Sequence, residues 1–347
     1  MSAKELFGLE GVEHELIENY QPKFLAIGGE HVVYEIPDHP DIVAKVEVMS
    51  LKDSITWNDE HGEPMGVLSE EFKAQRDEYI KLHIEKYQQL KKYFGNEHVL
   101  PQKEFLLKVP VPPNVLRLLY DEKPPLQGTE TWSVAKIQRR AAELSDQNRL
   151  SLVAGNAELE NLNAEEYNRV TEHLVFGKDS EMPLKENELL DIQSKDDLKK
   201  LLEQAENDDE LMVSLRELLK KIVIYTNETG DVIDIIGKDN LVFTRKDGKW
   251  TYRLVDPLYP GDKKIVSEAK AVLLKLSKGI EFNNEEHRFL MHTFNIVRTV
   301  NGLAEQVGIP ERIDIVPEDM EKKDMDYWAL LKKKLPIFEK TETNGAD

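Results

Sequence analysis

The chain has 347 residues without a cysteine, 40% of them hydrophobic and 32% charged, and its formal net charge at pH 7 is −20. This is the composition of an ordinary soluble protein, and the length suffices for two lobes with separate hydrophobic cores. Apolar runs of only a few residues exclude a membrane span, the negative charge opposes binding to nucleic-acid backbones, and the lack of cysteine excludes disulfides and thiolate–metal sites, which fits a cytoplasmic setting.

Three short strands are predicted first, at about 23–28, 31–36 and 42–48. Gly28 and Gly29 lie at the turn between the first two strands, and Lys45 points inward from the third. Glycines allow backbone N–H groups to approach phosphate oxygens, and a lysine on a following strand supplies a positive charge to the same oxygens. The pattern is typical of a lid over nucleotide phosphates, although a glycine pair followed by alternating apolar residues also indicates a simple hairpin.

Residues 50–68 show no steady hydrophobic periodicity, which predicts an exposed insertion. A long helix is predicted after it, from about Ser69 to Phe94. Ser69 is a suitable N-cap for this helix, and Gly95 is a suitable C-terminal stop.

Two segments with alternating apolar residues, 103–109 and 132–138, predict a pair of strands after the helix. We place the boundary between the two lobes at the end of the 132–138 strand. This gives an N-terminal lobe over 1–138 and a mainly helical C-terminal lobe over 139–347. Polar and acidic residues dominate 140–210, where we expect helices joined by loops.

The chemistry-bearing residues of the second half surround one predicted hairpin. An apolar helix face between about 211 and 225 leads to a loop that contains Asp234 and ends at Asn240, which opens a short strand. A turn at 246–249 follows, and Asp256 ends the partner strand. An acidic residue, an asparagine and an aspartate in this order form the metal-binding half of a phosphoryl-transfer site, because amide and carboxylate oxygens suit Mg²⁺.

This order of features resembles the protein-kinase-like fold, in the broad sense that includes aminoglycoside phosphotransferases and other small-molecule kinases. The features are, in sequence, the glycine turn, the strand lysine, the long helix, the strand pair, the apolar helix, the asparagine loop, the hairpin and the aspartate. The resemblance spans about residues 22–300. It implies an α+β, bilobal fold with a small antiparallel-sheet lobe that carries one long helix, followed by a mainly helical lobe.

The resemblance also implies how a nucleotide is held. Gly28 and Gly29 would cover the phosphates of ATP, Lys45 would hold its α- and β-phosphates, and the backbone near Gln138 would face the adenine. A helix glutamate would orient the lysine, and three candidates repeat every seven residues, Glu71, Glu78 and Glu85. We choose Glu85, which lies two to three turns before the helix end, and a solvated stripe of charges is the alternative interpretation.

The asparagine loop departs from the pattern of protein kinases, in which the catalytic aspartate precedes the metal-binding asparagine by five positions. Ile235 occupies that position, Asp234 lies one residue earlier, and no histidine precedes it. In one interpretation Asp234 still accepts or orients the proton of a substrate hydroxyl, with Gly237 absorbing the unusual backbone. In the other, Asp234 is structural and the protein is a pseudokinase or a nucleotide-binding interaction protein.

We therefore expect an enzyme that uses ATP and Mg²⁺ to phosphorylate a hydroxyl group, with Asn240 and Asp256 as metal ligands and Asp234 as the catalytic residue. Pro257 follows Asp256 directly, and no activation segment with an Ala-Pro-Glu motif is recognisable. Both features favour a small-molecule acceptor, whose identity the sequence does not predict. The pseudokinase interpretation stays open, as does transfer of AMP, because one fold can bind ATP in more than one orientation.

Overall fold

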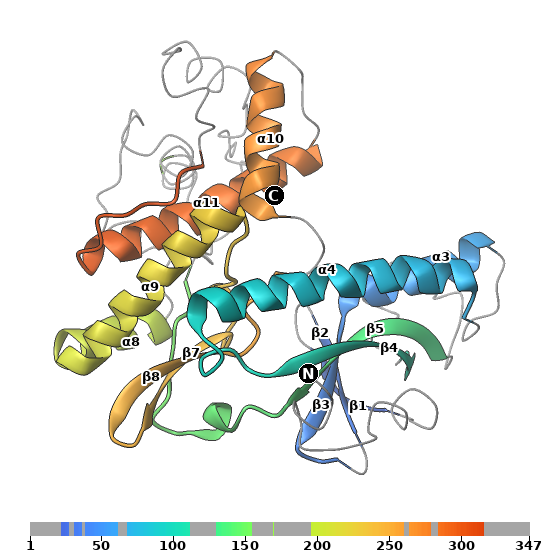
Figure 1. The fold of residues 1–347 in the computed structure, drawn as a ribbon, viewed down its shortest axis with the longest axis horizontal. Coiled ribbons are helices and arrows are strands. Elements are labelled where there is room, and N and C mark those ends of the chain that lie inside the picture. The colour runs from blue at the N-terminus through green and yellow to red at the C-terminus, as the bar shows by residue number, and fades with distance from the viewer. Residues whose placement is uncertain are drawn as a thin grey trace, which may run out of the picture. The chain divides into compact units, whose positions relative to one another are not determined.

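The structure is a computed structural model that describes residues 22–27, 31–36, 39–61, 68–111, 130–154, 169, 196–259, 264–278 and 284–315. The chain divides into two compact units, the first formed by 1–142 with 260–262 and the second by 143–259 with 263–347. Both units combine helices with antiparallel strands, so the predicted α+β class is confirmed (Figure 1).

The first unit contains a five-stranded antiparallel sheet in the order β1-β2-β3-β5-β4. Its strands are β1 (Lys23–Ile27), β2 (His31–Glu35), β3 (Ile42–Glu47), β4 (Gln102–Pro110) and β5 (Glu130–Arg139). All five predicted strands of this region are therefore confirmed. Gly28 and Gly29 separate β1 from β2 but lie outside the described residues, so the glycine lid stays a prediction.

The sheet has one apolar face and one charged face, since successive side chains along a strand point to opposite sides. Ala44 and Val46 of β3 belong to a buried core that also includes residues of β2, β4 and β5. Lys45 and Glu47 alternate with them along the strand and are only partly buried. The strand pattern therefore directs Lys45 away from the hydrophobic core.

The predicted exposed insertion at 50–68 is wrong as far as residue 61, because helix α3 (Val48–His61) occupies this stretch. Leu51 and Ile55, one helical turn apart, are fully buried in the core of the sheet. Ser50 Oγ lies 3.2 Å from Ser133 Oγ of β5 and ties the helix to that strand. Another apolar residue of α3, Met49, is exposed, so the hydrophobic pattern gave no clear helical period.

The predicted long helix is confirmed as α4 (Glu70–Phe94). Ser69 is its N-cap, and the Ser69 Oγ accepts a hydrogen bond from Phe72 N–H at 3.2 Å. At the other end, Gly95 has a φ of 95°, and its N–H donates to the Lys91 carbonyl at 3.0 Å. Both predicted helix boundaries are therefore correct, and α4 packs against β4 (Figure 1).

The second unit combines a three-stranded sheet with helices. The strands, in the sheet order β6-β7-β8, are β6 (Leu150–Ser151), β7 (Leu241–Lys246) and β8 (Lys249–Leu254). The helical segments are η1 (Ala142–Ser145), which begins at the boundary of the two units, α8 (Asp196–Glu206), α9 (Asp209–Thr229), α10 (Ile265–Ser277) and α11 (Asn284–Gln306). The predicted apolar helix is α9, which contacts α8, α11 and β8. Within the described residues no helix has both the length and the apolarity of a membrane span.

The β7–β8 hairpin closes with a tight turn at the predicted position. Asp247 and Gly248 have φ values of 53° and 82°, the left-handed conformations that a two-residue type I′ turn requires. The six cross-strand pairs run from Lys246 with Lys249 at the turn to Leu241 with Leu254 at the open end. The hairpin therefore brings the residues before β7 close to those after β8.

Candidate functional site

Backbone hydrogen bonds from two other segments fix the path of the loop between α9 and β7. The Asp234 N–H donates to the Pro257 carbonyl at 2.9 Å. The Ala154 N–H donates to the Ile235 carbonyl at 2.7 Å. The loop is therefore held by the segment after β8 on one side and by the segment after β6 on the other.

Asp234 organises this loop through both oxygens of its carboxylate. Oδ1 accepts hydrogen bonds from the backbone N–H groups of Ile236 at 2.9 Å and Gly237 at 3.1 Å. Oδ2 accepts a hydrogen bond from Nδ2 of Asn240 at 2.7 Å. With Asp234 only 2% exposed, the carboxylate holds the loop backbone and the Asn240 side chain in one arrangement.

The electrostatics of the loop favour a nearby cation. Burial raises the pKa of Asp234 above its ordinary value, and the negative charge of Asp256 also raises it. The N–H groups of Gly237 and Ile236 lower it through their hydrogen bonds to the carboxylate. A cation beside two carboxylates that repel one another would stabilise their charged forms.

The unusual backbone of the loop lies at Asp239 rather than at the predicted Gly237. Asp239 has a φ of 64°, in the left-handed region that non-glycine residues rarely adopt. The φ of Gly237 lies outside that region, and its lack of a side chain has another reason. A Cβ at Gly237 would lie 2.1 Å from Nδ2 of Asn240, so glycine provides the space for the amide to reach Asp234.

The structure brings together the three residues predicted for metal binding and catalysis. The backbone carbonyl of Asn240 accepts hydrogen bonds from the backbone N–H of Val255 at 2.8 Å and of Asp256 at 3.4 Å. Because Nδ2 of Asn240 is bonded to Asp234, Oδ1 is the end of this amide that can bind a metal ion. Asp256, 7% exposed, supplies a carboxylate from the neighbouring strand end.

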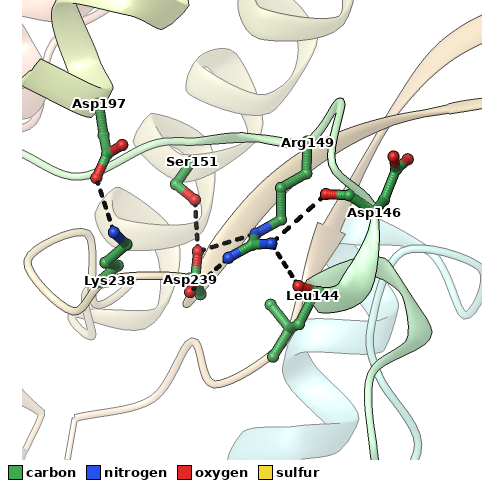
Figure 2. Close-up of polar contacts among 7 residues, drawn as sticks. All are labelled: Leu144, Asp146, Arg149, Ser151, Asp197, Lys238 and Asp239. Carbon is green, nitrogen blue, oxygen red and sulfur yellow. Dashed lines mark hydrogen bonds and ion pairs between the residues drawn. The ribbon is translucent and has the colours of Figure 1, made fainter.

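Arg149 and Ser151 hold Asp239 in its left-handed conformation, a role that the sequence did not predict (Figure 2). The Arg149 Nε and Nη2 groups donate to Oδ1 and Oδ2 of Asp239, each at 3.3 Å. The Ser151 hydroxyl donates to Oδ1 of Asp239 at 2.7 Å. Arg149 also donates to the carbonyl groups of Leu144 and Asp146. We call Arg149, Ser151 and Asp239 the Asp239 clamp.

In the first unit, Lys45 lies in a row of charged side chains across the sheet. Lys45 pairs in register with Lys136 of β5, and Lys136 pairs with Glu104 of β4. Residues opposite one another on neighbouring strands lie on the same face. Lys136 is buried. Two neighbouring ammonium groups, those of Lys45 and Lys136, favour an anion beside them.

Helix α4 does not bring the predicted Glu85 to the pocket that contains Lys45. Glu85 is exposed and lines a separate groove. The residues of α4 beside Lys45 are Tyr79 and His83, which share its pocket with Glu47 and Glu104. The Tyr79 hydroxyl donates to Glu47 at 2.7 Å, and His83 Nδ1 lies 3.0 Å from Glu104.

The two carboxylates that share the pocket of Lys45, those of Glu47 and Glu104, therefore come from strands and not from α4. Glu47 lies two residues after Lys45 on the same face of β3, and alternation along the strand was the signal for it. Glu104 depends on the register in which β4 pairs with β5, which the sequence does not reveal. The pairing of Glu85 with Lys45 stays a prediction.

Gln138, the residue predicted to lie near adenine, is the penultimate residue of β5. It pairs in register with Val43 of β3 and with Gln102 of β4 and is 2% exposed. Within the described ranges its Oε1 has no hydrogen-bond partner. The adenine contact stays a prediction.

Comparisons with known proteins identify no relative, so the function is proposed from the geometry of the site alone. A scan against models of protein families and searches of curated proteins and of solved structures gave no match to this chain. Among the residues that the structure describes, no three histidine or acidic side chains cluster in a way that suits a metal ion. A Mg²⁺ ion bound with a nucleotide needs only one or two protein ligands, because phosphates and waters supply the others.

Proposed function

We propose that this protein binds a Mg²⁺–nucleotide complex and transfers a phosphoryl group from ATP to a hydroxyl of a small-molecule acceptor. The observation that carries the proposal is the arrangement of Asn240 and Asp256 around Asp234. The Asn240 Nδ2 group donates to Asp234 at 2.7 Å. The Oδ1 atom is then the end of the amide that would bind a hard cation. Asp256 supplies the carboxylate that such a cation prefers.

The charged face of the first sheet supports the nucleotide part of the proposal. Lys45 and its register partner Lys136 provide positive charge of the kind that phosphate oxygens require. In phosphoryl transfer, the protein accelerates the reaction mainly by positioning the reactants and neutralising charge. Lys45 would act on the α- and β-phosphates, and Mg²⁺ held by Asn240 and Asp256 would neutralise the transferred group.

The order of elements supports a protein-kinase-like fold as part of the same proposal. A strand lysine is followed by the long helix α4 and a strand pair, and an asparagine and an aspartate flank a hairpin in the second unit. Fold likeness alone does not define a reaction. The kinase-like interpretation therefore depends on the chemistry of Lys45, Asn240 and Asp256.

A second candidate function is nucleotide binding without catalysis. The observation that favours it is the state of Asp234, whose two oxygens accept three hydrogen bonds within the loop and which is 2% exposed. A general base needs a free lone pair within reach of the substrate proton. In this arrangement Asp234 is a positioning residue for Asn240.

Product analysis separates these candidates from one another and from AMP transfer. The protein would be incubated with Mg²⁺ and ATP labelled at either the γ- or the α-phosphate, together with a panel of hydroxyl-bearing small molecules. Transfer of the γ-label supports phosphorylation, and transfer of the α-label supports AMP transfer. Nucleotide binding without transfer of either label supports the noncatalytic candidate.

The matched variants for this assay are Asp256→Asn and Asp247→Asn. Both remove one negative charge from the hairpin region, but Asp247 lies in the exposed turn. We expect Asp256→Asn to abolish Mg²⁺-dependent transfer and Asp247→Asn to leave it unchanged. Equal activity of the two variants would contradict the metal assignment.

A further inference from the structure

A groove of about 670 Å³ lies between α3 and α4 of the first unit. The helices meet where the ring of Trp57 on α3 packs against that of Phe72 on α4, with 5.7 Å between the ring centroids. Small-molecule sites typically have volumes of about 300–1,000 Å³. The groove is thus large enough for a ligand, and it does not include Lys45 or the loop of the second unit.

Arg76 is the most unusual residue of this groove. It is 7% exposed, and within the described part of the chain its Nε has no hydrogen-bond partner. Its guanidinium lies 4.8 Å from the centroid of the Phe72 ring. Burial lowers the pKa of Arg76, while the charges of Asp53 and Glu47 favour its protonated form. A buried cation with an unsatisfied N–H group costs free energy until an acceptor completes its hydrogen bonds.

Trp57 adds a second unsatisfied donor to the same groove. Its Nε1 is buried and lacks a hydrogen-bond partner among the described residues. The indole ring is held in place by stacking on His61, with 4.0 Å between centroids, and by its contact with Phe72. Because Arg76 and Trp57 both offer N–H groups, the group that is missing is an acceptor, and a carboxylate suits a guanidinium best.

Exposed acidic side chains line the rest of the groove. They are Asp53 and Glu60 of α3 and Glu78 and Glu85 of α4, and one exposed lysine, Lys81, also lines the groove. The four carboxylates outnumber the two cations, Arg76 and Lys81, so their combined field favours a ligand with a positive charge. A ligand that brings a carboxylate to Arg76 is therefore favoured when it also carries a positive charge for these residues.

We propose that the groove between α3 and α4 binds a small zwitterion of the amino-carboxylate class. Its carboxylate accepts hydrogen bonds from Arg76 and Trp57, and its ammonium group lies among the acidic side chains. Tyr79 lines both this groove and the pocket of Lys45, but the groove contains neither Lys45 nor Asn240 nor Asp256. Binding of the zwitterion therefore does not depend on phosphoryl transfer.

The test uses the full-length chain and isothermal titration calorimetry. The probes are unbranched ω-amino carboxylates from glycine to 8-aminooctanoate, with the matching carboxylates and alkylamines as singly charged controls. We expect at least one amino carboxylate to bind at one site, more tightly than either of its singly charged counterparts. Arg76→Met should weaken this binding by roughly tenfold or more, and Trp57→Phe, which removes only the indole N–H, by roughly threefold to tenfold.

Glu71→Gln is the control variant, since Glu71 is exposed on α4 but does not line the groove. We expect it to bind the best probe as the unchanged protein does. Failure of every amino carboxylate to bind at millimolar concentration would overturn the proposal. Unchanged binding by Trp57→Phe would overturn it too, whether or not Arg76→Met folds, and equal affinity for the singly charged carboxylate would overturn the zwitterion class.

Discussion

At Gly237, a single methyl group would change the geometry of the candidate metal site. A Cβ there would lie 2.1 Å from the Asn240 amide nitrogen, so the amide or the loop backbone would have to move. Asp239 shows a different constraint, because its φ of 64° is strained for a residue with a side chain. Sterics at Gly237 and hydrogen bonds at Asp239 thus both determine where Asn240 lies.

We predict that Gly237→Ala displaces the Asn240 side chain and weakens any Mg²⁺-dependent stabilisation by nucleotide. The overlap should also lower the free energy of unfolding by about 1–3 kcal/mol. Urea unfolding with and without Mg²⁺–ATP measures both effects. The control is Gly248→Ala, where φ is 82° but no atom lies within 4 Å of the added Cβ, so it should lose stability without losing the Mg²⁺ response. A Gly237→Ala protein that behaves like the unchanged one would contradict this account.

The pKa of Asp234 gives a second prediction at this scale. Burial and the charge of Asp256 hold it above the ordinary value of 3.8, so the native state binds this proton more tightly than the unfolded chain. The contribution of Asp234 to stability is therefore fully present below pH 3.8 and declines as the pH rises through the raised pKa. An NMR titration of the Asp234 carboxyl carbon measures the pKa directly.

Asp256→Asn should lower the pKa of Asp234 relative to the unchanged protein, because it removes one of the charges that raise it. Asp247→Asn, in the exposed hairpin turn, should leave it unaltered. A native pKa of Asp234 below 3.8, or one that does not respond to Asp256→Asn, would show that the two carboxylates are not arranged as described.

At the scale of elements, the two-residue strand β6 positions the loop that precedes β7. It pairs with β7, and Arg149 and Ser151 at this strand hold Asp239 in the loop that precedes β7. Asp239 lies 90 positions after Arg149 in the chain. The strand therefore connects the segment after η1 to the candidate metal site.

A double-mutant cycle with Arg149→Gln and Asp239→Asn tests this connection. The two groups are partly buried and form two hydrogen bonds, so we expect a coupling energy of about 1–2 kcal/mol in urea unfolding. Lys238 and Asp197 form a more exposed pair at 3.5 Å, and the corresponding cycle should give a coupling of about 0–0.5 kcal/mol. Equal coupling in the two cycles would contradict the role of the Asp239 clamp.

The elements that sequence alone predicted are those with a strong local signal. Ser69 and Gly95 marked both ends of α4, and the turn at 246–249 marked the hairpin. Helix α3 was missed because its buried apolar residues, Leu51 and Ile55, are too few to show a helical period. Their burial depends on the sheet against which they pack. Local propensity predicts an element well when the signal lies within it, and poorly when tertiary contacts decide.

The candidate site follows the same rule. Asp234, Asn240 and Asp256 were predictable because one loop and one hairpin bring them together. The choice of Glu85 used a heptad repeat of exposed residues, whereas α4 faces the pocket of Lys45 with Tyr79 and His83. Long-range pairs such as Arg149 with Asp239 leave no local pattern, so only the fold reveals them.

At the scale of the whole molecule, the proposed function assigns complementary chemistry to the two compact units. The first carries the positive charge of Lys45, and the second carries Asn240 and Asp256, the proposed metal ligands. A phosphoryl-transfer site requires both kinds of group. Variants in either unit should therefore impair the same nucleotide binding.

The most direct test of this claim is thermal unfolding with ATP, with and without Mg²⁺. At about 100 times its dissociation constant, a ligand stabilises the native state by about 2.7 kcal/mol, which shifts the unfolding temperature visibly. The variants are Lys45→Ala and Asp256→Asn, with Lys108→Ala at a half-exposed position and Asp247→Asn in the exposed turn as matched controls. We expect a Mg²⁺-dependent shift that the controls keep and both variants lose. No shift in the unchanged protein, or a shift that survives in both variants, would contradict the claim.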